Sequence, residues 1–347
     1  MTVKLSSKMS ILSQQAPETP FLLTFEVVNR GDSDIYVLKH GTSLEGLFSD
    51  CFEITRDGKR VPYDGPLVKR GAPTEKDYVR IRPGKSVISE VDLSSCYQVS
   101  VPGKYEVASC GALPDVVTRS ELRAKAKSDE PTQAPVEVKV RTRKFTVKPG
   151  MHGRATTGEA ARRQEDDTEL PKAKSTKKRK AKSAKAKTPT ITGGSVDQKK
   201  KAQEGHDDGY NLAVAARAAL NNEARYKEWF GTHTATRFKT VKDVYTTVRD
   251  RMRTKSFTYD LSGTGCKPSW YAYTYKGTTK IWYCGAFCSA PATGTDSKAG
   301  TVLHEHSHAS ASTDDIAYGQ SNCRQLAKTQ PTSAVSNADN FEYYAGG

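Results

Sequence analysis

The chain has 347 residues, of which 54 are Lys or Arg and 39 are Asp or Glu, so its formal net charge is +15 and its pI is about 9.4. This length is sufficient for two domains that each have a hydrophobic core. No apolar stretch approaches the roughly 18–20 residues of a membrane span, so we expect no membrane-spanning segment.

The positive charge is concentrated in one part of the chain. Residues 171–190 carry nine Lys or Arg and no acid, and residues 199–201 add three lysines, so +15 minus these twelve leaves only +3 elsewhere. A basic surface spread over a folded domain is therefore excluded, and we expect no specific nucleic-acid partner. A basic segment that binds polyanions remains as the alternative explanation of the charge.

The N-terminal part, residues 1–147, is predicted to be an all-β, sandwich-like domain. Short apolar or alternating segments recur at about ten-residue spacing without a helical period, a pattern typical of a β-sandwich. The segments are 21–29, 35–38, 52–55, 87–93, 104–108 and 136–147. Residues 148–203, by contrast, lack a hydrophobic pattern and contain Lys-Ala-Lys-Ser repeats, which predicts a flexible linker.

The C-terminal part, residues 204–347, is predicted to be an α+β domain. Asp207 or Asp208 is the expected N-cap of a first helix, because apolar residues follow with helical spacing. We expect helices over 210–225, 241–253, 298–309 and 318–328, and short strands over 256–259, 270–275 and 280–284.

The seven cysteines favour an oxidising compartment. None forms a C-x-x-C pair, so a thiolate zinc site or redox motif is not expected. Four lie in the C-terminal part and permit two disulfides in three connectivities, and the three before them permit one bridge and a leftover thiol. Met1 is followed by polar residues and not by the apolar core of a signal peptide, so we expect a secreted protein whose signal was removed, or another export route.

A metal-binding motif lies in the expected helix 298–309. His304-Glu305-His306-Ser307-His308 matches H-E-x-x-H, in which the first and last imidazoles share a helix face and can bind one Zn²⁺. Glu305 lies beside them and could act as general base toward a metal-bound water. The alternative is a solvated helix with incidental histidines. His306 is expected at the surface or behind the ligands.

A third zinc ligand is expected a short distance further along the chain. Asp315 follows His308 by seven residues, and Tyr318 follows Asp315 with D-x-x-Y spacing. The alternatives are an N-cap role for Asp315 with Asp314 as the ligand, and a core position for the tyrosine.

These residues resemble those of the aspzincins, the deuterolysin and peptidyl-Lys metalloendopeptidase family. The likeness rests on H-E-x-x-H followed by Ser312-Thr-Asp-Asp-Ile-Ala-Tyr-Gly319, although Ser312 stands where the family has Gly, and it extends over about residues 205–347. The N-terminal part resembles the family's propeptide, notably in Leu67-Val-Lys-Arg-Gly71. The likeness is greatest to secreted bacterial toxic aspzincin endopeptidases, which are made as proenzymes.

The resemblance implies a zincin-like domain with one catalytic zinc, held by His304, His308 and Asp315. It makes Glu305 the general base and Tyr318 the hydrogen-bond donor to the developing oxyanion.

Further positions carry implied roles in specificity and in disulfide pairing. Asp339 and Glu342 fall where peptidyl-Lys members place two carboxylates in the S1′ pocket, and two acids suit a compact ammonium group. The alternative is that they are ordinary surface acids. The pairing Cys266–Cys284 resembles a family disulfide, and Cys288–Cys323 is then the remaining pair.

The sequence therefore predicts a secreted zinc endopeptidase made as a proenzyme. Residues 1–147 would be the inhibitory propeptide, 148–203 an activation linker cut by the mature enzyme itself, and 204–347 the catalytic domain that cleaves peptides on the amino side of Lys. The alternative is a polyanion- or nucleic-acid-binding protein that acts through its Lys-rich segment and has a non-functional metal site.

Overall fold

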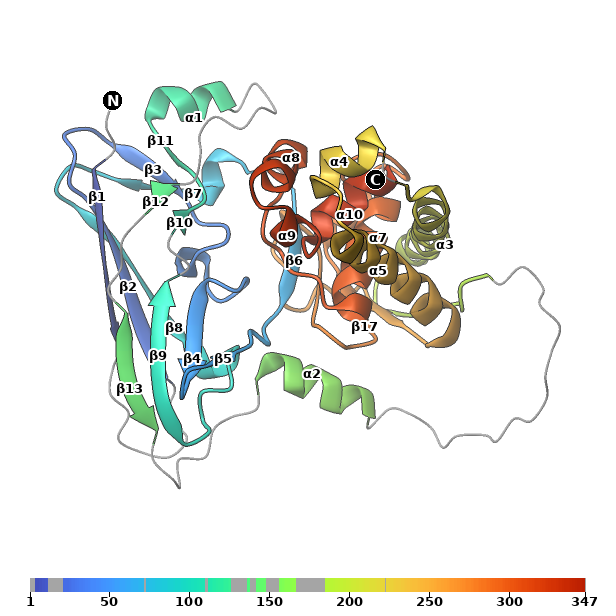
Figure 1. The fold of residues 1–347 in the computed structure, drawn as a ribbon, viewed down its shortest axis with the longest axis horizontal. Coiled ribbons are helices and arrows are strands. Elements are labelled where there is room, and N and C mark those ends of the chain that lie inside the picture. Colours follow the sequence, from blue (N-terminus) through green and yellow to red (C-terminus); the bar gives the residue numbers. More distant parts are fainter. Residues whose placement is uncertain are drawn as a thin grey trace. The chain divides into compact units, whose positions relative to one another are not determined.

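The computed structural model describes residues 4–11, 21–71, 73–109, 112–125, 136–137, 142–147, 156–166, 185–221 and 223–346. The chain divides into two compact units (Figure 1): one comprises residues 1–66 and 72–159, and the other comprises residues 67–71 and 160–347. Five residues from the N-terminal part of the sequence therefore belong to the second unit. The centre of the predicted linker, 167–184, lies outside the described residues.

The first unit consists mainly of antiparallel strands. Its sheets have the strand orders β1-β2-β8, β11-β3-β7 and β13-β9-β4-β5, with β10 and β12 as a separate pair. The strands are β1 (Leu5–Ile11), β2 (Leu22–Asn29), β3 (Ile35–Leu38), β4 (Phe52–Arg56), β5 (Lys59–Val61), β7 (Tyr78–Ile81), β8 (Ser86–Asp92), β9 (Gly103–Ser109), β10 (Ala112–Leu113), β11 (Val116–Val117), β12 (Val136–Glu137) and β13 (Arg143–Val147).

The core of this unit follows from alternation along the strands. Leu23, Phe25 and Val27 of β2 are buried, while the residues between them are only partly buried. Tyr105 and Phe145 stack between β9 and β13 with ring centroids 4.9 Å apart. One helix, α1 (Arg119–Lys125), lies inside the range predicted to be all-β, and α2 (Thr157–Asp166) crosses the boundary between the units.

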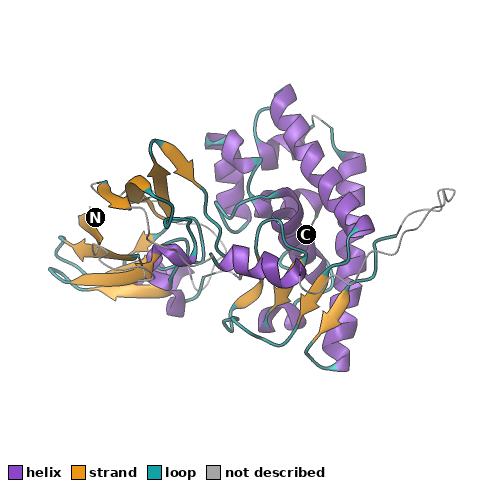
Figure 2. Cartoon of the chain, turned by 90° about the horizontal axis from the view of Figure 1, so that it is seen from below, coloured by secondary structure: helices purple, strands orange, loops and turns teal. Residues whose placement is uncertain are grey.

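The second unit is α+β, as predicted, and helices dominate the part of Figure 2 that carries the C-terminus. Its helices are α3 (Val196–Ala219), α4 (Ala224–Phe230), α5 (Ala235–Thr254), α6 (Gly285–Ser289), α7 (Lys298–Ala311), α8 (Gln320–Thr329), α9 (Pro331–Ala334) and α10 (Ala338–Ala345). Its strands are β6 (Leu67–Arg70), β14 (Thr190–Thr192), β15 (Thr258–Asp260), β16 (Trp270–Thr274) and β17 (Lys280–Tyr283). Among the described residues, no helix combines the length and apolarity needed to cross a membrane.

The second unit has one five-stranded sheet, in the order β14-β15-β17-β16-β6. β14, β15 and β17 run parallel, β16 is antiparallel to β17, and the outermost strand β6 is antiparallel to β16. A register shift between Trp270 and Ala272 interrupts the pairing of β16 with β6. A peptide segment about 200 residues away in sequence therefore extends this sheet, in the manner of strand addition.

Helix α3 begins earlier than the sequence predicted. Ser195, and neither Asp207 nor Asp208, is its N-cap, and its side chain forms a capping box with Gln198. The predicted helix over 210–225 is also interrupted, because α3 ends at Ala219 and α4 starts at Ala224. Together with β14, the first residues of α3 lie within the range predicted as a linker, so regular structure extends to the N-terminal side of residue 204.

Helix α7 lies in the middle of the second unit. Every residue from Lys298 to Ala309 is buried, so the helix is enclosed on all sides. Gly209 explains how closely α3 approaches it, because a Cβ on this glycine would lie 2.6 Å from a methyl carbon of Val302. The helix that carries H-E-x-x-H is therefore a rigid central element and not a solvated surface helix.

Candidate active site

The two histidines of the motif lie on one face of α7, near its C-terminal end. The helix is closed by Ser312, which adopts a left-handed conformation with φ of 60° and donates its backbone N–H to the carbonyl of His308 at 3.0 Å. Glycine is usually favoured in this conformation, and Ser312 adopts it here. The reversal directs the following residues back toward the histidines.

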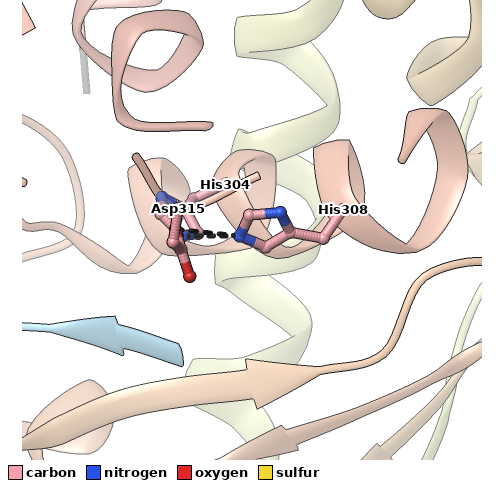
Figure 3. Close-up of side chains that lie close together, drawn as sticks. All are labelled: His304, His308 and Asp315. Atoms are coloured by element: carbon pink, nitrogen blue, oxygen red, sulfur yellow. Dashed lines mark hydrogen bonds and ion pairs between the residues drawn. The ribbon is translucent and has the colours of Figure 1, made fainter. Parts of the chain in front are cut away.

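Asp315 completes a group of three potential metal ligands (Figure 3). The two Nε2 atoms of His304 and His308 are 3.0 Å apart, and Oδ1 of Asp315 is 3.2 Å from each of them. Ligand atoms around a tetrahedral Zn²⁺ are about 3.3 Å apart when each metal–ligand distance is near 2.0–2.1 Å. All three side chains are at most 1% exposed. The separation of the ligand atoms therefore suits a zinc ion.

The hydrogen bonds around the two imidazoles also favour a metal. Nδ1 of His308 lies 2.9 Å from the carbonyl oxygen of Thr313, which can only accept, so Nδ1 is the donor in this contact. Nδ1 of His304 lies 2.8 Å from a carboxylate oxygen of Asp339, so Nε2 is the nitrogen that faces His308 and Asp315. The two Nε2 atoms and the Asp315 carboxylate thus face one another, an arrangement that a bound cation stabilises.

Asp315, and not Asp314, joins the histidines. The carboxylate of Asp314 instead pairs with the ammonium of Lys276. The loop that follows is held by Asn337, whose Oδ1 accepts the backbone N–H groups of Ile316 at 2.7 Å and Ala317 at 3.0 Å. Sequence reasoning assigned no such role to this fully buried asparagine.

Glu305 is completely buried beside the ligands. Burial raises the pKa of its carboxyl to about 8, against the opposing effects of His304 and of the ammonium and backbone amide of Lys69. His306 is also completely buried, and its Nε2 lies 2.7 Å from the hydroxyl of Tyr259. It therefore lies behind the ligands and not at the surface.

Asp339 and Glu342 form a closed acidic slot, not the surface acids of the alternative interpretation. Both are at most 2% exposed, and they contact the ammonium group of Lys69 in β6. Lys69 Nζ lies 2.8 Å from Glu342, 3.1 Å from Asp296 and 3.5 Å from Asp339. Burial alone would lower the pKa of Lys69, but Asp339 and Glu342 outweigh it and hold that pKa well above its ordinary value. The slot therefore holds a charged lysine.

The neighbours of Lys69 in β6 contact the other candidate site residues. The backbone N–H of Val68 donates to Oδ2 of Asp315 at 3.0 Å. Nη1 of Arg70 donates to the hydroxyl of Tyr318 at 2.6 Å and to the carbonyl of Val68 at 3.0 Å. Tyr318 is only partly buried and its hydroxyl faces this group, so it is not a core residue. Sequence reasoning quoted 67–71 only as part of a resemblance, since contacts so distant along the chain leave no local pattern.

One of the two expected disulfides is present. Cys266 and Cys284 are bonded and connect the approach to β16 with the end of β17. The expected pair Cys288–Cys323 is wrong, because both residues are free thiols. Cys323 is buried near Asn337, whereas Cys288 lies on α6 and packs against the core of the unit. Cys96 is a free thiol as well, and Cys110 lies outside the described residues.

The buried H-E-x-x-H helix, with a third carboxylate ligand and an edge strand beside it, defines a metallopeptidase site of the zincin class. The family described as lysine-specific metallo-endopeptidase, Aspzincin_M35, matches residues 215–346. An extracellular protease from Aeromonas hydrophila is 32% identical over 335 residues, covering 92% of this chain and 86% of that protein. A peptidyl-Lys metalloendopeptidase from Grifola frondosa is 30% identical over 348 residues, with the same two coverages.

The chain therefore belongs to the aspzincin family and is a zinc metalloendopeptidase. Among solved structures, a zinc peptidase from Grifola frondosa is 35% identical and covers 44% of this chain and 96% of its own, with a TM-score of 0.41.

Proposed function

We propose that the protein is a secreted proenzyme that cleaves peptides on the amino side of Lys and is inhibited by its own β6 strand until its Lys-rich linker is cut. The observation that carries this proposal is the buried ion pairing of Lys69 with Asp339 and Glu342, next to the three ligand residues. Secretion is supported by the relatives, which include an extracellular protease.

The chemistry assigns a role to each residue near the ligands. Zinc, held by His304, His308 and Asp315, would supply a Lewis acid that makes a bound water acidic. Glu305 would take a proton from the attacking water and pass it to the departing amine nitrogen. Tyr318 would donate a hydrogen bond to the carbonyl oxygen as negative charge develops there.

The acidic slot would select lysine as the residue that contributes this amine. A long side chain that ends in an ammonium fits it, because Lys69 Nζ contacts both carboxylates and lies 6.0 Å from the ring centroid of Tyr271 and 5.6 Å from that of Tyr343. A neutral side chain would leave the slot's carboxylates buried without a cation, which costs binding energy.

The same contacts would make β6 an inhibitor. An extended peptide on the edge strand of a sheet gains main-chain hydrogen bonds, and Lys69 adds the side chain that the slot prefers. Release would require that the N-terminal unit no longer be tethered to the catalytic unit, which a cut in the linker achieves.

The test of specificity uses the propeptide-free enzyme and the isosteric variant Glu342→Gln. Loss of one partner of a buried ion pair predicts a fall of at least about 30-fold in kcat/KM for peptides with Lys after the cleaved bond. The control is Glu228→Gln on the exposed face of α4, where Glu228 pairs with Arg324. Undiminished preference for Lys in Glu342→Gln would contradict the assignment of the slot.

The test of inhibition uses the full-length chain before linker cleavage. Lys69→Met keeps the length of the side chain and removes its charge, so we expect higher activity on a small peptide. The matched control is Lys59→Met, an exposed lysine of β5. Equal activity of the two variants would show that Lys69 does not block the site.

A further inference from the structure

Within the proposed function, the Val68–Lys69 peptide bond has the position of a bond to be cut. Lys69 occupies the slot, and Glu305 lies near the backbone amide of Lys69, which is the nitrogen that cleavage would release. Strand β6 nevertheless has to remain intact if it is to inhibit. Some feature of β6 must therefore distinguish it from a substrate.

That feature is the side chain after the lysine. The guanidinium of Arg70 lies over two aromatic rings, 5.8 Å from the centroid of Trp270 and 5.3 Å from that of Tyr318. The residue is only 3% exposed. A planar cation over aromatic faces is a favourable arrangement, so these two rings form a guanidinium subsite next to the lysine slot.

The guanidinium also interrupts the contact that catalysis would need. Arg70 Nη1 is 2.6 Å from the Tyr318 hydroxyl and 3.0 Å from the Val68 carbonyl oxygen. A guanidinium has donors only, so Tyr318 accepts this hydrogen bond and its own proton points elsewhere. In the proposed reaction, however, Tyr318 has to donate to that same carbonyl oxygen. Arg70 Nη1 therefore bridges the two groups and takes the place of the direct hydrogen bond.

We propose that arginine after lysine marks a peptide as an inhibitor of this enzyme, because its guanidinium occupies the Trp270–Tyr318 subsite and keeps the Tyr318 hydroxyl from the carbonyl ahead of the lysine. The inference rests on the proposed lysine specificity and extends it by one residue. Lysine followed by a small residue leaves the subsite empty and is cleaved.

The sequence of the basic segment agrees with this distinction. Of the lysines in 171–190, Lys178 is followed by Arg and Lys177 by Lys. The others are each followed by Ala, Ser or Thr: Lys172, Lys174, Lys180, Lys182, Lys185 and Lys187. By this rule most of the segment is substrate, whereas Lys69-Arg70 is inhibitor.

The experiment compares two peptides that span residues 64–74, one with the natural sequence and one with Ala in place of Arg70. Binding is measured with the propeptide-free Glu305→Ala enzyme, and hydrolysis at the Val68–Lys69 bond is measured with the active propeptide-free enzyme. We expect the arginine peptide to bind about tenfold more tightly. We expect its cleavage at saturation to be at least about tenfold slower, as for loss of one oxyanion donor.

A third peptide has Lys at the position of Arg70, so it keeps the positive charge but lacks the planar guanidinium. We expect its cleavage rate at saturation to be close to that of the alanine peptide. In the full-length chain, Arg70→Ala should lead to nicking between Val68 and Lys69, whereas Arg60→Ala, at an exposed arginine of β5, should not. Nicking should disappear when Arg70→Ala is combined with Glu305→Ala.

The two proposals fail in different ways. Cleavage of the arginine peptide as fast as the alanine peptide, or faster, would overturn the role of Arg70 and leave lysine specificity intact. Faster cleavage would make the guanidinium an additional oxyanion donor. Failure to cleave the alanine peptide would overturn the lysine specificity itself, and this inference with it.

Discussion

At the scale of single residues, Asp339 and Glu342 of α10 differ in how closely they contact His304. Oδ1 of Asp339 lies 2.8 Å from Nδ1 of His304, and the same carboxylate accepts the backbone N–H of Gly319 and the hydroxyl of Tyr343. Glu342 approaches His304 Nδ1 only to 3.5 Å but contacts the Lys69 ammonium at 2.8 Å. In the proposed mechanism Asp339 would therefore orient a ligand, whereas Glu342 would mainly recognise the lysine.

This difference predicts separate effects on metal binding. Asp339→Asn in the propeptide-free enzyme should weaken zinc binding about 10–100-fold, because a ligand histidine loses its carboxylate partner. Glu342→Gln should change zinc affinity far less. Competition with a chromophoric chelator measures both affinities. Equal losses in the two variants would mean that the acids act as one group and that the division of roles is incorrect.

At the scale of elements, the β16–β17 hairpin carries the edge to which β6 is added. Cys266 and Cys284 close a loop with a sequence separation of 18 residues around this hairpin. Tyr273 and Trp282 stack across it with centroids 4.9 Å apart. The disulfide therefore constrains the element that presents Trp270 and Tyr271 to the inserted strand.

Removing the disulfide should destabilise the catalytic unit. A loop of this size predicts a loss of about 3 kcal/mol in the free energy of unfolding. The comparison is between the double substitution Cys266→Ala with Cys284→Ala and the single substitution Cys288→Ala, a free thiol. Urea unfolding of the inactive Glu305→Ala chain reports on this unit, because all three tryptophans lie within it. A loss as large for Cys288→Ala would contradict the free-thiol assignment.

At the scale of the whole molecule, the last residues of the basic segment contact the core of the catalytic unit. Ala186 packs against the core, and the backbone N–H of Lys187 donates to the carbonyl of Met252 at 2.8 Å. The following strand β14 pairs with β15. A cut beyond Lys187 would therefore remove a strand from the sheet.

The N-terminus of the mature enzyme should accordingly be Lys187 or a lysine before it that is followed by a small residue. N-terminal sequencing and intact mass of the product identify the site. The Glu305→Ala chain serves as the control and should stay uncut if maturation is autocatalytic. A mature N-terminus within β14 would contradict this prediction, because the sheet would have lost its first strand.

Much of the fold was predictable where the sequence pattern is local. The observed bounds of strands β2 and β3 and of helix α7 nearly match those predicted from the alternation and the helical spacing of apolar residues. The first half of α3 was not predicted from the sequence. It packs through Ala202, Gly205 and His206, which allow a close helix contact but do not form the periodic pattern of large apolar residues by which a helix is recognised.

The pairing of Cys288 with Cys323 failed for a related reason. Elimination assumed that every cysteine in the C-terminal part is paired, and only the fold shows that Cys288 and Cys323 are both free thiols.

The candidate ligands could be predicted from the sequence, because H-E-x-x-H and D-x-x-Y are short-range patterns. Helix geometry and a tight return bring His304, His308 and Asp315 together. What occupies the lysine slot, and which groups surround Tyr318, became known only from the three-dimensional fold. Lys69 and Arg70 reach these groups across more than 200 residues of chain, by adding a strand to an edge, and no local pattern records such a contact.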